Sequence, residues 1–322
     1  MSDKAIGVDL GGTNLRVALV EVDGTEARIL DQRRQLLQER SPHAVAQVLV
    51  QLCHDLDAAG AAPVGIGAAA MLHGTKGMVA NAPNLGWRDV DFGALVAKDL
   101  GRPVSLENDL SAITWGEHRF GAARGFDDVI CVFVGTGVGG GAVLCGELYR
   151  GAGNAALEIG HLKVHPGGRL CGCGQRGCLE AYAGGRALAE LAREAPESLW
   201  LEIAGGDAEA LHGGHLDQAA QRGDARAKEV VGRASIFLGQ ALASVATLFN
   251  PSCLLLGGTV WQGCAFLREE ATRTLKELLP LPAAGWMQCV EATLEDDAGV
   301  LGAADLALAH RAAARGDHKH RR

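Results

Sequence analysis

One short segment of the chain gathers side chains that bind metal ions. His161 is followed by Cys171, Cys173 and Cys178, a spacing of His-x9-Cys-x-Cys-x4-Cys with glycines between the cysteines. Three thiolates and one imidazole complete a tetrahedral structural zinc site, and glycine lets the loop fold around the metal. A redox-active loop is the alternative for these cysteines, and the other cysteines are expected to be buried free thiols. The spacing favours a closed zinc site that does no chemistry itself.

A second set of residues is suited to binding phosphate. Three apolar runs each end in a turn rich in Gly and Thr: Gly11-Gly12-Thr13, Gly135-Thr136-Gly137 and Gly257-Gly258-Thr259. Such a turn exposes closely spaced backbone N–H groups with no Cβ in the way. Asp9 adds a carboxylate where a magnesium ion on the phosphates would sit. An ordinary hairpin explains any one turn, but three turns of this composition favour phosphate binding.

The second turn also satisfies a different fingerprint. The spacing Gly135-x-Gly137-x-x-Gly140 is that of dinucleotide-binding proteins, and Glu158 lies near the distance expected of a ribose-binding acid. That fingerprint requires a helix to open at the glycines. Residues 141–144 are instead predicted to be a strand, so NAD binding is disfavoured.

The elements that must position these residues occur twice along the chain. A strand over residues 5–10, a Gly-Thr turn, a strand over 15–22 and a hairpin at 23–24 form the first copy. The second copy begins with a strand over 129–134. A long helix follows over 225–249, where apolar residues recur at helical spacing. The sequence therefore predicts two related α/β halves.

The composition limits the classes of function. The chain has 322 residues, of which 45 are glycine and nine are cysteine, and a formal net charge of −8. The length suggests two domains, and the negative charge argues against nucleic acid as a partner. No run approaches the ~20 consecutive apolar residues of a membrane span, and Met1-Ser2-Asp3-Lys4 does not open a signal peptide. We therefore expect a soluble cytoplasmic protein that has no membrane partner and no disulfide scaffold.

These motifs together resemble a known family. The sequence from Asp9 to Arg16 resembles the first phosphate motif of the ROK family of sugar kinases. Residues 135–141 resemble the second phosphate motif, and residues 256–259 the turn that contacts adenosine. Residues 158–180 are similar to the family's zinc signature, which is the most specific of these motifs. The resemblance covers residues 5–310.

The resemblance implies a fold. It is the α/β, two-lobed actin/hexokinase-like (ribonuclease H-like) ATPase fold with duplicated α/β halves. A small lobe is expected over residues 1–115 and a large lobe with the zinc loop over residues 116–297. A C-terminal helix at about 298–322 is expected to pack back on the small lobe. The family also implies a homodimer or homotetramer.

The resemblance assigns roles residue by residue. Asp109 matches the catalytic base and Asn108 a sugar contact, although Asn108-Asp109 alone would be typical of a helix N-cap. The neighbouring Glu107 is expected to have no role. Glu158 and His161, three residues apart and so on one face of a helical turn, match sugar contacts, with His161 also binding zinc.

The full set of expected contacts is as follows. The sugar is expected to contact Gly74, Asn84, Asn108, Asp109, Glu158, His161 and Glu180. ATP with its magnesium ion is expected to contact Asp9, Gly11, Gly12, Thr13, Asn14, Arg16, Gly135, Thr136, Gly137, Gly257 and Gly258. Structural zinc is expected to be bound by His161, Cys171, Cys173 and Cys178. Metal ligation would thereby fix the orientation of His161 and Glu180.

One segment departs from the family pattern. After the strand that ends near Ala69 the family has a Pro-Gly turn beside the sugar, whereas this chain has Ala70-Met71-Leu72-His73-Gly74. We expect Gly74 to take over the backbone role of that turn.

The implied activity is ATP-dependent phosphorylation of a hexose at its primary 6-hydroxyl, with glucose favoured, as in a glucokinase. Kinase activity on N-acetylglucosamine, N-acetylmannosamine or fructose is the alternative, and polyphosphate is an alternative donor. Other family members are sugar-responsive repressors with a helix-turn-helix before the first phosphate motif. That function is disfavoured here because the motif already begins at Asp9.

Overall fold

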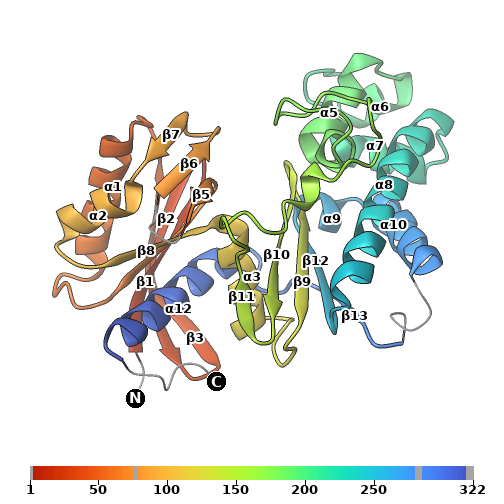
Figure 1. Ribbon diagram of the computed structural model, residues 1–322. Coiled ribbons are helices and arrows are strands. Elements are labelled where there is room, and N and C mark those ends of the chain that lie inside the picture. The colour runs from red at the N-terminus through yellow and green to blue at the C-terminus, as the bar shows by residue number, and fades with distance from the viewer. Residues whose placement is uncertain (1–2, 75–77, 280–284, 317–322) are drawn as a thin grey trace. The chain divides into compact units, whose positions relative to one another are not determined.

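The computed structural model describes residues 3–74, 78–279 and 285–316 (Figure 1). The chain forms two compact units. Unit 1 consists of Met1–Asp127, Gly141–Ala156 and Thr293–Arg322, and unit 2 consists of Asp128–Gly140 and Leu157–Ala292.

Unit 1 contains a five-stranded sheet in the order β3-β2-β1-β4-β8. Its strands are β1 (Asp3–Leu10), β2 (Asn14–Asp23), β3 (Glu26–Leu36), β4 (Val64–Ala68) and β8 (Val104–Asn108). The first three form an antiparallel meander that includes the predicted strands over 5–10 and 15–22, whereas β4 and β8 run parallel to β1. Leu10 pairs with Ala68, and Ala68 pairs with Asn108. The carboxyl ends of the three parallel strands therefore lie at one edge of the sheet.

Helices cover both faces of this sheet. They are α1 (Pro42–Leu56), α2 (Phe92–Leu100), α3 (Asp109–Phe120) and α12 (Asp297–Ala314). Leu49 of α1 and Phe92 of α2 are buried in one apolar cluster with β1 and β4, and Val300 of α12 lies in a second cluster with β1 and β2. Gly7 and Gly65 permit the close approach of α12, because a Cβ at either position would overlap a backbone carbonyl of that helix.

A small antiparallel sheet completes unit 1. It consists of β5 (Met71–His73), β6 (Met78–Ala82) and β7 (Trp87–Val90). The turn between β6 and β7 carries Asn84, and Gly74 follows β5 in a left-handed conformation with φ of 61°. No signal in the sequence predicted this sheet, although two predicted sugar contacts, Gly74 and Asn84, lie at the ends of its strands.

A second five-stranded sheet has the order β11-β10-β9-β12-β13. Its strands are β9 (Val129–Val134), β10 (Val138–Leu144), β11 (Glu147–Tyr149), β12 (Cys253–Gly257) and β13 (Gln288–Glu291). In unit 2, β12 runs parallel to both β9 and β13, with Gly257 paired with Phe133. The turn after β9 and the turn after β12 therefore leave the sheet at the same edge.

The described helices of unit 2 lie between residues 159 and 278. They are the 3₁₀ turn η1 (Ile159–His161), α4 (Glu180–Ala183), α5 (Gly185–Glu194), α6 (Ser198–Ile203), α7 (Gly213–Gln221), α8 (Ala225–Phe249), α9 (Thr259–Gly263) and α10 (Ala265–Leu278). The predicted helix over residues 225–249 is confirmed as α8. Asp224 caps its start by accepting from the backbone N–H of Ala227 at 2.7 Å, and Asn250 ends it with φ of 43°.

Helix α8 is also, among the described residues, the one helix long and apolar enough by length and composition to cross a membrane. Its apolar residues are interleaved with Ala, Gly and Ser, so no long run of apolar residues marks it in the sequence. More than half of its apolar window is buried inside the chain, where Leu238 and Leu242 are fully covered. These features are those of a core helix.

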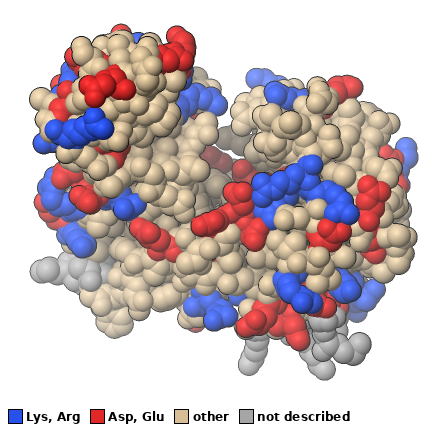
Figure 2. Space-filling view, turned by 180° about the vertical axis from the view of Figure 1, so that it is seen from behind, with Lys and Arg blue, Asp and Glu red and all other residues tan. Residues whose placement is uncertain are grey.

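The two units differ from the two lobes predicted at residues 1–115 and 116–297. Helix α3 lies wholly in unit 1, and residues 141–156 belong to unit 1 as well. Helix α12 packs against β1 and α3 within unit 1. On the face shown in Figure 2, acidic and basic side chains lie interspersed.

Candidate active site and metal centre

The first phosphate turn connects β1 and β2 in unit 1. The backbone N–H of Gly11 donates to the carbonyl of Asn14 at 3.0 Å, and the Thr13 side chain is exposed. A Cβ at Gly12 would lie 2.5 Å from the Cβ of Asn84. The structure therefore brings the predicted nucleotide turn and one predicted sugar contact side by side.

Asp9 is the last acidic residue before this turn. Its side chain lies on the α12 side of the sheet, where a Cβ at Gly299 would be 3.7 Å from its Cγ. Burial raises the pKa of Asp9, and the nearby positive charge of Arg16 opposes this rise. A half-buried carboxylate of this kind can hold a hard cation such as magnesium.

The guanidinium of Arg16, which was predicted to contact ATP, has three partners within the protein. Its Nε donates to Oε1 of Gln32 at 2.8 Å, its Nη1 donates to the carbonyl of Asp296 at 2.6 Å, and its Nη2 pairs with the carboxylate of Asp297. The side chain is almost completely buried. Arg16 thus fixes the start of α12 to the sheet, and a contact between Arg16 and ATP stays a prediction.

Asn108 and Asp109 lie where β8 ends and α3 begins. Oδ1 of Asn108 accepts from the N–H of Ser111 at 3.1 Å, so Asn108 is the N-cap, while its Nδ2 donates to the carbonyl of Ala70 at 3.1 Å. Asp109 is the first residue of α3, and its Oδ1 accepts from the N–H of Leu110 at 2.9 Å. The capping and catalytic interpretations are therefore compatible.

Two acidic residues, one on β8 and one on α3, have roles that the sequence did not reveal. Glu107, expected to have no role, is 4% exposed and forms an ion pair with Arg150. Glu117 of α3 is fully buried, and its carboxylate accepts from the N–H groups of Ala122, Thr293 and Leu294. Neither residue type nor spacing distinguishes them from surface acids, because their partners lie far away along the chain.

The segment that departs from the family pattern ends at the edge of a described range. Gly74 is exposed, and its carbonyl accepts from Nδ2 of Asn154 at 3.4 Å. Residues 75–77 lie outside the described part of the chain. Asn154, which precedes the predicted contact Glu158 by four residues, is a neighbour of Gly74 that the sequence analysis did not identify.

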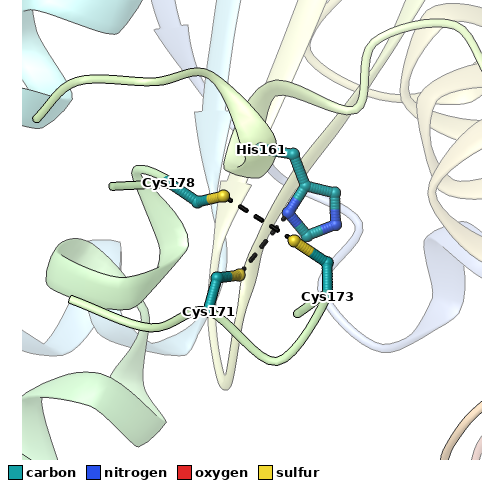
Figure 3. A group of neighbouring side chains, drawn as sticks. All are labelled: His161, Cys171, Cys173 and Cys178. Carbon is teal, nitrogen blue, oxygen red and sulfur yellow. Dashed lines mark hydrogen bonds between the residues drawn. The ribbon is translucent and has the colours of Figure 1, made fainter. Parts of the chain in front are cut away.

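The predicted zinc ligands converge in unit 2 (Figure 3). The ligand atoms of His161, Cys171, Cys173 and Cys178 all lie within 4.8 Å of one another. Sγ of Cys173 and Sγ of Cys178 are 3.7 Å apart, and Sγ of Cys171 is 3.7 Å from Nδ1 of His161. With Zn–S bonds of ~2.3 Å, the sulfurs of a tetrahedral site are about 3.8 Å apart. The four residues therefore fit a zinc ion.

The protonation of the thiols bears on how they bind the metal. Burial raises the pKa of Cys171 to about 12, and Nζ of Lys163 donates to Sγ of Cys178 at 3.1 Å. Because zinc binds thiolates, the metal must displace the proton of Cys171 as it enters.

The loop geometry also requires glycine at position 177. There φ is 83°, and a Cβ would overlap the carbonyl of His165.

Glu158 and His161 lie on one turn, as predicted. Oε2 of Glu158 is 4.0 Å from Nε2 of His161, whose other ring nitrogen faces Cys171. Burial raises the pKa of Glu158, with His161 lowering it and the charge of Glu180 raising it further. The His161 ring therefore bridges the metal ligands and a predicted sugar contact.

The second and third Gly-Thr turns are neighbours in unit 2. A Cβ at Gly135 would lie 3.7 Å from Oγ1 of Thr259, and a Cβ at Gly258 would lie 2.5 Å from the carbonyl of Val134. No helix opens at Gly135, since strand β10 begins at Val138 and includes residues 141–144, which were predicted to be a strand. The dinucleotide fingerprint therefore lacks the helix that it requires.

Each unit carries part of the predicted residue set. Unit 1 holds Asp9, Gly11, Gly12, Thr13, Asn14, Arg16, Gly74, Asn84, Asn108 and Asp109. Unit 2 holds Gly135, Thr136, Gly137, Glu158, His161, Cys171, Cys173, Cys178, Glu180, Gly257 and Gly258.

Comparisons with known proteins agree with this picture. Residues 5–310 match the ROK family. The chain is 34% identical over 317 residues to a glucokinase of Streptomyces coelicolor, covering 94% of this chain and 96% of that protein. It is 33% identical to an N-acetylmannosamine kinase of Escherichia fergusonii, covering 94% and 97%.

A solved structure gives the same result for the fold. It is a ROK family glucokinase from Streptomyces griseus in complex with glucose and AMPPNP, with a TM-score of 0.78 and 34% identity over 95% of this chain and 99% of that one. The α/β fold of actin/hexokinase-like type is thereby confirmed. From the family match over nearly its whole length and from these relatives, the chain belongs to the ROK family.

Proposed function

We propose that the chain is an ATP-dependent hexose kinase that phosphorylates the primary 6-hydroxyl of its sugar, with glucose as the favoured substrate. Its glucokinase relatives support this proposal. The observation that carries it is the register of β1, β4 and β8. Through that register the Gly11–Gly12 turn and Asp109 follow strands that end at the same edge of one sheet.

In the proposed reaction Asp109 is the general base. Its carboxylate accepts the proton of the 6-hydroxyl, and the oxygen attacks the γ-phosphorus of ATP as the bond to the departing ADP oxygen breaks. The first turn of α3 orients this carboxylate through the N–H of Leu110. Asn108, fixed as the N-cap, is proposed to bind a neighbouring sugar hydroxyl.

The Gly-Thr turns are proposed to bind the phosphates and the nucleoside. Their backbone N–H groups and the exposed hydroxyls of Thr13 and Thr136 supply donors to phosphate oxygens. Magnesium, when bound, neutralises charge on the phosphates, and Asp9 is the carboxylate that would hold it. Zinc is proposed to have a structural role, because its four ligands leave no open position.

A kinase for N-acetylmannosamine is the second candidate, favoured by the 33% identity to such an enzyme. The candidates are separated by incubating the full-length chain with ATP and magnesium and, in turn, glucose, N-acetylmannosamine, N-acetylglucosamine and fructose. Release of ADP measures turnover, and phosphorus NMR identifies the 6-phosphate. Polyphosphate replaces ATP in a parallel series. Turnover is expected to be highest with glucose and ATP, and a chain that phosphorylates none of these sugars contradicts the proposal.

The proposed function also includes a cellular compartment and an oligomeric state. A hexose 6-phosphate is a substrate for carbohydrate metabolism, and ATP is available in the cytoplasm, so we place the protein there. We also propose a homodimer or homotetramer, to be measured by light scattering of the purified chain.

A further inference from the structure

The phosphate turn Gly135–Gly137 of unit 2 is hydrogen-bonded to one segment of the chain, residues 180–186. The carbonyl of Gly135 accepts from the N–H of Gly185 at 2.8 Å, and the carbonyl of Thr136 accepts from the N–H of Arg186 at 3.0 Å. The N–H of Val138 donates to Oε2 of Glu180 at 3.0 Å. Residues 180–186 thus fix the carbonyls of Gly135 and Thr136 and the first N–H after the turn.

The same segment follows the metal ligand Cys178 directly in the chain, with no loop between them. Glu180 follows the ligand Cys178 by two residues, and the residue between them, Leu179, is fully buried with its N–H bonded to the carbonyl of Leu162 at 2.9 Å. Oε1 of Glu180 lies 3.9 Å from Sγ of Cys171. The two oxygens of one carboxylate therefore face the turn and the metal ligands respectively.

The packing leaves Glu180 little freedom to move independently. A Cβ at Gly137 would overlap Oε2 of Glu180, and a Cβ at Gly160 would lie 3.4 Å from its Cβ and would overlap the carbonyl of Val138. A displacement of the loop that carries Cys171 and Cys178 would therefore be transmitted to the turn. An N–H donating to a carboxylate is also stronger than one donating to a neutral acceptor.

We propose that Glu180 is a positioning residue that couples the Cys–His metal centre to the phosphate turn Gly135–Gly137. Metal binding holds the segment from Cys178 to Arg186 in place, and that segment holds the turn in the geometry that binds nucleotide phosphate. This proposal rests on the assignment of the turn to nucleotide in the proposed function. Because coupling between two binding sites is reciprocal, nucleotide must in turn tighten the binding of the metal.

The coupling is measured without sugar and without turnover. The dissociation constant of AMPPNP with magnesium is determined by calorimetry for the full-length chain, first loaded with zinc and then stripped with a zinc-selective chelator. Couplings of this kind are typically 5–150-fold, and we expect the dissociation constant to rise about tenfold on stripping. An unchanged constant in a stripped chain that keeps its near-ultraviolet circular dichroism overturns the proposal.

The reciprocal measurement starts from the loaded protein. The zinc dissociation constant is measured at equilibrium by competition with a chromogenic chelator, with and without AMPPNP, and we expect the nucleotide to lower it about tenfold; equal constants overturn the proposal. Should stripping unfold the chain, the effect of AMPPNP on this constant is compared with that in Glu180→Gln, and an equal effect in both proteins overturns the proposal. A loaded chain that binds no AMPPNP would instead contradict the proposed function, so the two failures are distinguishable.

Two variants approach the coupling from its two sides. Glu180→Gln is expected to keep its zinc, but zinc should no longer strengthen its binding of AMPPNP to the same extent. The matched control is Glu202→Gln, a change at an exposed acid of α6, and it should keep the full coupling. Gly137→Ala places a Cβ against the Glu180 carboxylate without touching a metal ligand, and we expect its zinc dissociation constant to rise several-fold. Wild-type coupling in Glu180→Gln, or wild-type zinc affinity in Gly137→Ala, overturns the proposal.

Discussion

Arg150 and Glu107 form a bidentate ion pair inside unit 1. Nε of Arg150 lies 2.9 and 3.0 Å from the two carboxylate oxygens, and Nη2 lies 2.7 Å from Oε1. The Glu107 side chain is 6% exposed and that of Arg150 is 27% exposed. Glu107 immediately precedes Asn108 and Asp109 on β8, so the pair joins this strand end to the segment that begins at Arg150.

We expect Arg150→Met to destabilise the chain and lower kcat. The substitution leaves the Glu107 carboxylate buried without its partner, which costs about 3 kcal/mol of unfolding free energy. Urea unfolding measures the loss. In the double variant Arg150→Met with Glu107→Gln the uncompensated charge is gone, so we expect it to recover part of the stability. A double variant that loses the sum of the two single losses would contradict this account.

Asp109→Asn should abolish turnover while leaving the sugar site intact. An amide cannot accept the hydroxyl proton, and removing a general base lowers kcat by about 10²–10⁴-fold. The N–H of Leu110 can still donate to the amide oxygen, so the start of α3 is preserved. Glucose binding by calorimetry is expected to change little. Asp99→Asn, an exposed acid of α2, is the control. Near-normal kcat in Asp109→Asn would remove the base assignment.

Cys173→Ser is expected to lose zinc and stability together. Cys173 is exposed, so removing its sulfur disturbs packing little and tests the metal directly. A tetrahedral site with three of its four ligands binds zinc far more weakly, and the lost binding energy is lost folding energy. Metal analysis and thermal unfolding measure both effects. Cys289 lies outside the cluster and is exposed rather than buried as expected, and Cys289→Ser should change neither quantity. Full zinc content in Cys173→Ser would contradict the four-ligand site.

Elements with local signals could be predicted from the sequence. Helix α8 has the predicted bounds because Asp224 caps its start and Asn250-Pro251 stops it. The convergence of His161 with the three cysteines was also predictable, since metal-ligand spacing is a local property. The same holds for the turns that end β1, β9 and β12, because glycine after a buried strand marks each one.

Features that depend on distant partners could not be predicted in this way. Glu107 is buried because Arg150 reaches it from 43 residues away, and Glu117 because it bonds to Thr293 and Leu294. Arg16 matches a phosphate motif, yet its guanidinium is bonded to the start of α12. The inclusion of residues 141–156 in unit 1 likewise depends on tertiary packing.

Asp9→Asn should raise stability and lower activity at the same time. Burial raises the pKa of Asp9 above its usual value of 3.8, so the folded chain holds its proton to higher pH than the unfolded chain does. Between these two pKa values the folded state binds more protons, and stability therefore falls as pH rises through this window. The asparagine variant lacks this titration. Its advantage in unfolding free energy over the wild type should grow as pH rises from about 4 and then stay constant.

The control separates this effect from a general loss of negative charge. Asp31 is an exposed acid of the same sheet whose pKa is lowered, chiefly by a hydrogen bond from Arg33, so Asp31→Asn should not stabilise the chain at neutral pH. Magnesium with AMPPNP should narrow the difference between wild type and Asp9→Asn, because the cation stabilises the buried carboxylate of the wild type only. If the two proteins unfold with the same pH dependence, burial of Asp9 does not oppose its charge. If the ligand leaves their difference unchanged, Asp9 does not hold the magnesium ion.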